Sequence, residues 1–148
     1  QIQRQPRNVI SMLPGAQPKR RILIADADPT TGSSISNLAR AERCEIVGAK
    51  DGVQAYRQLK SDADFQAVVI DPGLPGMDAF ELLRYMKSEN RLRRIPIVLV
   101  AADSGVELIA RGFSAGAYAC LWKPFAPDVL WGTVRILLPL TAAKQKAA

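Results

Sequence analysis

The sequence predicts an α/β fold with a doubly wound, five-stranded parallel sheet and helices on both faces. Between residues 21 and 140, short apolar runs alternate five times with segments whose apolar residues recur at helical spacing. The runs are almost uninterrupted in apolar residues, as expected for strands buried on both faces. The segments between them are long enough to serve as right-handed crossover helices.

Each predicted strand is an apolar run bounded by turn-forming residues such as Gly, Pro and Asp. We expect the strands at residues 22–25, 46–49, 67–70, 95–101 and 117–122. We expect the helices at about residues 29–42, 52–61, 79–89, 104–114 and 127–138.

Capping residues support the helix starts. Asp28 before Pro29 has the pattern of an N-cap followed by proline at the first helical position. Asp51 and Asp78 stand in position to cap the next two helices. At the other end, Pro139 is expected to stop the last helix.

The third predicted helix has the clearest core face. Leu82, Leu83 and Met86 recur at helical spacing behind Phe80. We therefore expect these four side chains to pack in the hydrophobic core.

The basic charge lies at the two ends of the chain. The 148 residues have a formal net charge of +6, and residues 1–20 and 141–148 hold six bases and no acid. The body from 21 to 140 is thus formally neutral. We expect a basic linker or extension at 1–20, one domain at 21–140, a tail at 141–148, and no nucleic-acid binding by the domain.

Several classes of protein are not favoured by composition. No apolar run approaches the roughly 18 residues needed to span a bilayer, so we expect no membrane insertion and a cytoplasmic location. The absence of histidine removes His-based catalysis, His metal ligands and phosphohistidine formation within this chain. Cys44 and Cys120 lie far apart in apolar segments, so we expect free thiols.

Three charged residues follow predicted strands and should meet at one sheet edge. Asp26 follows the first strand, Asp71 the third and Lys123 the fifth. Such a group suits phosphoryl chemistry, because Mg²⁺ prefers oxygen ligands and a carboxylate can attack phosphorus. Asp71 would be the nucleophile, and Lys123 would hold a phosphoryl oxygen.

These motifs resemble those of the receiver domains of two-component response regulators. The similar segments are RILIADAD at 21–28, VVIDPGLPGMDAFELL at 68–83, and the segment from Ile95 to the Lys123-Pro124-Phe125 motif. The resemblance covers about residues 21–138 and implies a flavodoxin-like fold with a cis bond before Pro124.

The resemblance also implies a function. Asp71 would accept a phosphoryl group from a sensor histidine kinase or phosphotransfer protein, with Lys123 assisting. Mg²⁺ would be bound by Asp26, Asp71 and Gly73. The protein would then be a phosphoprotein of a bacterial two-component phosphorelay and not an enzyme. Its output would be binding to another protein or formation of a homodimer.

The chain departs from the family pattern where signalling is concentrated. The second acid after the first strand, normally a direct metal ligand, is Ala27, and Asp28 competes as a helix cap. The small hydroxyl residue that ends the fourth strand is matched by Ala101, and the aromatic of the fifth strand by Cys120. We therefore expect an atypical receiver with weakened Mg²⁺ binding and a small response to phosphorylation.

Three aromatic residues leave alternatives open. Tyr118 and Trp122 share strand parity with Cys120, so they could place a ring on the same side, or serve as packing or edge residues. Trp131, with Ile136 nearby, could form a partner-binding patch or belong to the core.

Two other functions remain open. A phosphate-independent pseudo-receiver would explain Ala27, Ala101 and Cys120. The segment from Asp26 to Thr30 also fits the DxDxT motif of haloacid-dehalogenase-like phosphatases, with Asp26 as nucleophile and Asp28 as acid/base, although no further acidic pair follows the fourth strand.

Overall fold

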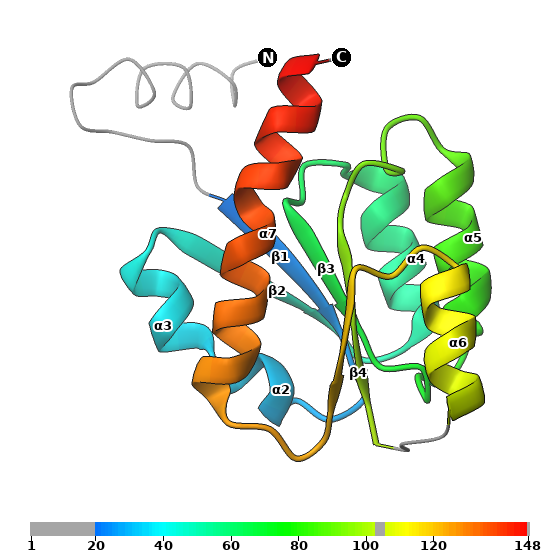
Figure 1. The fold of residues 1–148 in the computed structure, drawn as a ribbon, viewed down its shortest axis with the longest axis horizontal. Helices are drawn as coiled ribbons and strands as arrows, with labels where there is room; N and C mark the ends of the chain where they lie inside the picture. The colour runs from blue at the N-terminus through cyan, green and yellow to red at the C-terminus, as the bar shows by residue number, and fades with distance from the viewer. Residues whose placement is uncertain (1–19, 103–105, 148) are drawn as a thin grey trace.

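The computed structural model describes residues 20–102 and 106–147 and has a five-stranded parallel sheet in the order β2-β1-β3-β4-β5 (Figure 1). All four strand pairs are parallel, as the sequence predicts. The strands are β1 (Arg20–Ala25), β2 (Cys44–Ala49), β3 (Ala67–Ile70), β4 (Ile97–Ala101) and β5 (Ala119–Trp122).

The strand register brings the predicted site residues to one edge. Ala25 pairs with Ile70, so Asp26 and Asp71 follow neighbouring strands in the same direction. The backbone N–H of Asp71 donates to the carbonyl of Ala25 at 2.9 Å. Lys123 likewise follows directly after β5, and its N–H donates to the carbonyl of Ala101 at 2.9 Å.

Helices cover both faces of the sheet, with α4, α5 and α6 on one side and α2, α3 and α7 on the other (Figure 1). Their bounds are α2 (Thr30–Ser33), α3 (Ser36–Ala41), α4 (Gly52–Ser61), α5 (Ala79–Ser88), α6 (Val106–Ser114) and α7 (Pro127–Ala147).

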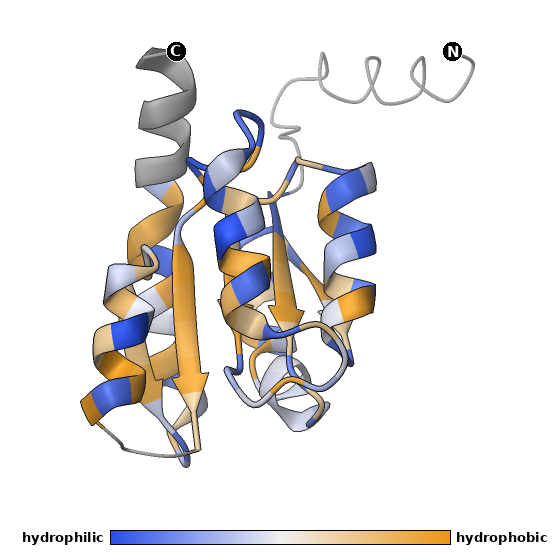
Figure 2. Ribbon diagram, turned by 90° about the vertical axis from the view of Figure 1, so that its right-hand side faces the viewer, coloured by the Kyte–Doolittle hydropathy of each residue, from blue (hydrophilic) through white to orange (hydrophobic). Residues whose placement is uncertain are grey.

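Two apolar cores lie between the sheet and its helix layers. The first core packs against α4 and α5, and the second core packs against α3 and α7. Figure 2 shows the hydrophobic strands that separate the two cores. Successive strand residues alternate between the cores, so Leu23 packs in the first core while Ile22 packs in the second. The predicted core face of α5 is confirmed, since Phe80, Leu82, Leu83 and Met86 are all buried.

Helix caps agree with the predictions at two starts and differ at one. Asp51 accepts a hydrogen bond from the backbone of Gln54, and Asp78 accepts one from Phe80. Asp28 accepts one from the N–H of Thr30, but α2 begins one residue later than predicted, so Pro29 takes the N-cap position.

The first predicted helix, 29–42, is wrong as a single helix. It splits into α2 and α3 at Ile35, whose φ and ψ are −109° and 1°. The hydroxyls of Ser34 and Ser36 donate to backbone carbonyls one turn back, and Gly32 lowers the helix propensity. Since Ile35 is fully buried, the break carries its side chain into the second core.

The prediction that Pro139 stops the last helix is also wrong, because Pro139 lies inside α7. Proline removes one backbone hydrogen bond, which can kink a helix without ending it. Leu137 and Leu138 just before it are buried against the sheet and stabilise the helix there. Most of the expected tail at 141–148 is therefore a continuation of α7 through Ala147.

The expected extension at 1–20 lies almost entirely outside the described residues, and Arg20 already belongs to β1. Among the described helices, none has the length and apolar character needed to cross a membrane.

Candidate functional site

Asp71 is held at the end of a fully buried strand. All four residues of β3 are buried, and the chain turns directly afterwards, with the N–H of Leu74 donating to the carbonyl of Asp71. The Asp71 Oδ1 atom accepts a hydrogen bond from the backbone N–H of Gly73 at 2.7 Å. A Cβ atom at position 73 would lie 3.3 Å from the same oxygen, so glycine lets the backbone approach the carboxylate.

Asp26 is the more deeply buried of the two carboxylates. Its side chain is only 3% exposed, compared with 15% for Asp71. The Oδ1 atom accepts from the backbone N–H of Asp28 at 3.0 Å. The Oδ2 atom accepts from the Thr31 hydroxyl at 2.6 Å and from the Lys123 ammonium at 2.7 Å.

Lys123 bridges the two carboxylates. Its Nζ atom lies 2.7 Å from Asp26 Oδ2 and 2.6 Å from Asp71 Oδ2. Burial by itself favours the neutral amine and lowers its pKa, but hydrogen bonds and charge from both carboxylates outweigh this effect and raise the pKa of Lys123 above its ordinary value. The sequence prediction that these three side chains meet is confirmed, as is the cis bond between Lys123 and Pro124.

The residues that depart from the family pattern lie in or directly after the strands that carry this group or end near it. Ala27 is exposed and directly follows Asp26. Ala101 is 1% exposed and presents only a methyl group where β4 ends. Cys120 is partly buried against the first core, and neither Cys44 nor Cys120 is in a disulfide.

Asp28 is a turn residue in this structure. Its Oδ1 atom accepts from the backbone N–H of Thr30 at 3.0 Å and from the Thr30 hydroxyl at 2.8 Å. The backbone hydrogen bond, followed by the hydroxyl, lowers the pKa of Asp28. The competing capping role is therefore the one these contacts support.

Thr31 belongs to the site, although no sequence motif singles it out. It is 4% exposed, and its hydroxyl faces Asp26 instead of solvent. Motif reasoning pointed to the neighbouring Thr30, because DxDxT names that residue. The difference depends on how α2 starts, which no local pattern specifies.

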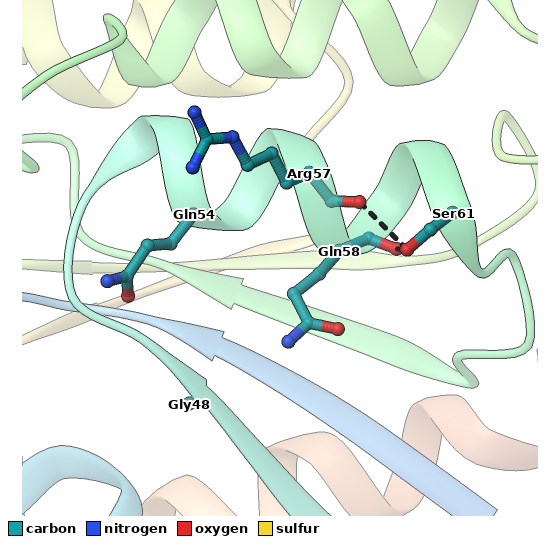
Figure 3. A pocket seen from close by; sticks show the side chains of 5 residues that line it. All are labelled: Gly48, Gln54, Arg57, Gln58 and Ser61. Atoms are coloured by element: carbon teal, nitrogen blue, oxygen red, sulfur yellow. Dashed lines mark hydrogen bonds between the residues drawn. The ribbon is translucent and has the colours of Figure 1, made fainter.

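A hollow of about 410 Å³ adjoins these residues. One wall comes from the segment around α2, with Asp28, Thr30, Thr31 and Ser34, and the other from the segment after β5, with Lys123, Pro124 and Phe125. A second hollow of about 300 Å³ lies between α4 and β2, away from both carboxylates. Figure 3 shows its lining, in which the Ser61 hydroxyl bonds back to the α4 backbone.

Hard oxygen donors for a divalent cation are present but few. Within 20–102 and 106–147, no group of three or more His, Cys, Asp or Glu side chains is arranged to hold a metal ion. Asp26 and Asp71 with the exposed backbone of Gly73 fit Mg²⁺, which accepts few protein ligands and keeps several waters. Lys123 occupies the position between the carboxylates and would compete with a cation there.

The aromatic alternatives are resolved in different ways. Trp131 is 5% exposed, and its Nε1–H donates to Glu42 Oε2 at 3.0 Å, so the core alternative is correct and a partner patch at Trp131 is wrong. Its neighbour Ile136 is 72% exposed. Tyr118, just before β5, and Trp122, its last residue, are 48% and 37% exposed, as expected for edge residues.

Comparison with known proteins agrees with the geometry. The family profile described as the response regulator receiver domain matches residues 22–135. Chemotaxis protein CheY1 of Helicobacter pylori is 28% identical over 119 residues, which cover 80% of this chain and 96% of that protein.

Solved structures share the fold. The receiver domain of Francisella response regulator 1452 is 26% identical, with a TM-score of 0.73 over 83% of this chain and 99% of its own. The receiver domain of the sensor histidine kinase PA1611 from Pseudomonas aeruginosa has a TM-score of 0.71 at 23% identity, over 82% of this chain and 99% of its own. That structure has a magnesium ion coordinated in its active-site cleft.

Proposed function

The chain belongs to the response regulator receiver family, and from this premise we propose that Asp71 is a phosphoacceptor for a sensor histidine kinase or phosphotransfer protein. The single observation that carries the proposal is the contact of one ammonium, Lys123 Nζ, with both Asp71 and Asp26. A cation in that position stabilises the charge that accumulates when a phosphoryl group is added to a carboxylate.

In the proposed transfer, Asp71 is the nucleophile. A carboxylate oxygen attacks the phosphorus of a phosphohistidine, and the new O–P bond forms as the P–N bond breaks. The electron pair of the P–N bond stays on the imidazole, which leaves as the neutral ring because its other nitrogen already carries a proton. The Gly73 N–H holds one oxygen of Asp71, while Lys123 donates to the other and can follow the phosphoryl oxygens.

Mg²⁺ would be held by Asp26, Asp71 and the Gly73 backbone, and when bound it neutralises phosphoryl charge. Because Ala27 supplies no carboxylate, fewer anionic ligands are present than in family members with two adjacent acids. Weak Mg²⁺ binding is therefore part of the proposal.

The proposed partners are a kinase or phosphotransfer protein and an output protein or second copy of the domain, in the cytoplasm. Helix α6 supports an output surface, since Gly112 is its one buried residue. Large hydrophobic side chains are exposed on α6 and at the two ends of β5, namely Val106, Phe113, Tyr118 and Trp122.

A phosphate-independent pseudo-receiver is the second candidate. It is favoured by Ala101, whose buried methyl group cannot donate a hydrogen bond to a phosphoryl group. The haloacid-dehalogenase-like phosphatase is less favoured, because the family match extends over residues 22–135 and Asp28 is engaged by Thr30. We propose that the domain is not an enzyme with turnover.

The test is intact mass measurement after incubation with Mg²⁺ and a small acyl phosphate or phosphoramidate. Wild type should gain the mass of one phosphoryl group, and Asp71→Asn should gain none. Asp78→Asn is a matched control, because Asp78 caps α5 and lies outside the site. An unmodified wild type would support the pseudo-receiver, and steady hydrolysis of a phosphate monoester would support the phosphatase.

A further inference from the structure

The buried hydroxyl of Thr31 makes a contact that the transfer chemistry does not explain. Thr31 Oγ1 donates to Asp26 Oδ2 at 2.6 Å, and this oxygen also receives the Lys123 ammonium. The adjacent Thr30 is exposed, and its hydroxyl donates to Asp28 instead. One of two neighbouring threonines is thus connected to the charged group.

The connection changes when Asp71 gains charge. An aspartyl phosphate adds roughly one to two negative charges and three acceptor oxygens beside Lys123. The ammonium has three donors and is drawn toward the greater charge. The hydrogen bond from Lys123 to Asp26 Oδ2 then weakens. Because the Asp26 side chain is only 3% exposed, solvent cannot replace that bond, and the hydrogen bond from the Thr31 hydroxyl becomes more important.

Helix α2 is an element that one hydrogen bond can stabilise appreciably. It has four residues, and its N-cap residue Pro29 makes no side-chain cap bond, so the side-chain acceptor at its start is Asp28, one residue further back. Its turns rest on a few backbone bonds, among them Ser33 N to Pro29 O at 3.1 Å and Ser34 N to Thr30 O at 2.9 Å. Helices this short are near the low end of local stability.

The end of β4 offers no comparable link. The side chain of Ala101 has no hydrogen-bond donor, and Cys120 has no ring that could move with it. A ligand shifts an equilibrium only through contacts that differ between two states, and at β4 those contacts are missing.

We propose that Thr31 is a positioning residue that links the phosphorylation state of Asp71 to the order of α2. In this chain the phosphorylated and unphosphorylated states then differ more at α2 than at β4. Helix α2 lies on the face of the sheet that α3 and α7 also cover. The inference rests on the proposed function, because it requires Asp71 to accept a phosphoryl group.

The experiment measures amide hydrogen exchange by mass spectrometry with and without excess acyl phosphate in Mg²⁺. Intact mass is recorded in parallel, so that phosphorylation is known for each sample. Wild type is compared with Thr31→Val, which removes the hydroxyl at nearly constant volume, and with Thr31→Ser, which keeps it. Thr30→Val is the matched control, and Thr31→Ala replaces Thr31→Val if circular dichroism shows that the latter is unfolded.

In wild type, phosphorylation should slow exchange in peptides covering α2 by a factor on the order of ten, as expected for one strengthened charge-assisted hydrogen bond. The response should persist in Thr31→Ser and Thr30→Val and disappear in Thr31→Val, when each variant is compared at the phosphorylated fraction that its intact mass gives. Phosphorylated wild type with unchanged exchange at α2, or Thr31→Val with a full response, would overturn the inference while leaving the proposed function intact. A wild type that gains no mass overturns the proposed function and this inference with it.

Discussion

Replacing Lys123 with Met should destabilise the domain by an amount that the site geometry sets. Because Nζ lies 2.7 Å from Asp26 Oδ2 and 2.6 Å from Asp71 Oδ2, those two oxygens are at most 5.3 Å apart. Two unit charges at that distance repel by about 3 kcal/mol at an effective dielectric constant of about 20. Loss of the bridging cation also leaves a carboxylate of 3% exposure without its ion pair, which costs a comparable amount in other proteins, about 3–5 kcal/mol.

Urea denaturation should therefore give Lys123→Met a free energy of unfolding about 3 kcal/mol below that of wild type. Lys50→Met is the matched control, since Lys50 is exposed and should change the value by less than about 0.5 kcal/mol. The double variant Lys123→Met with Asp71→Asn should recover most of the loss, because only one of the two carboxylates remains. If Lys123→Met is as stable as wild type, or if Asp71→Asn restores nothing, the bridge does not balance the two charges.

Three further predictions concern pH, metal binding and α7. The raised pKa of Lys123 stabilises the fold while the amine is protonated, so wild-type stability should fall as pH rises above about 10.5, and pH titration of unfolding should show a smaller fall in Lys123→Met. Ala27→Asp should tighten Mg²⁺ on the order of tenfold by adding an anionic ligand, and equal affinities in a calorimetric titration would mean that position 27 is not at the metal. Trp131→Phe should lower the free energy of unfolding by about 1–3 kcal/mol, because Glu42 loses its indole donor. Ile136→Ala, at an exposed position, should lower it by less than about 0.5 kcal/mol, and equal losses in the two variants would contradict the burial of the indole.

Sequence reasoning was accurate where one physical pattern dominates. Strands buried on both faces are continuous apolar runs, and β3 is buried at all four positions. Parallel connectivity then requires the strand ends to meet, which is why Asp26, Asp71 and Lys123 could be placed together from their positions after the strands.

Local patterns failed where propensity competes with packing. The run from 29 to 42 has helical periodicity, but burial of Ile35 and the serine hydroxyls breaks it into two short helices. Pro139 carries the usual signal for a helix end, yet the apolar residues before it hold α7 against the sheet.

By itself, the sequence determined the succession of strands and helices along the chain, the apolar faces and the three charged residues of the site. These features depend on residue type and spacing. Tertiary structure alone decided that Trp131 is buried against Glu42 and that Thr31, not Thr30, reaches Asp26. Each of these is a side-chain hydrogen bond whose partner is selected by the direction of a short segment. That direction results from packing across the whole sheet, which no local window of residues contains.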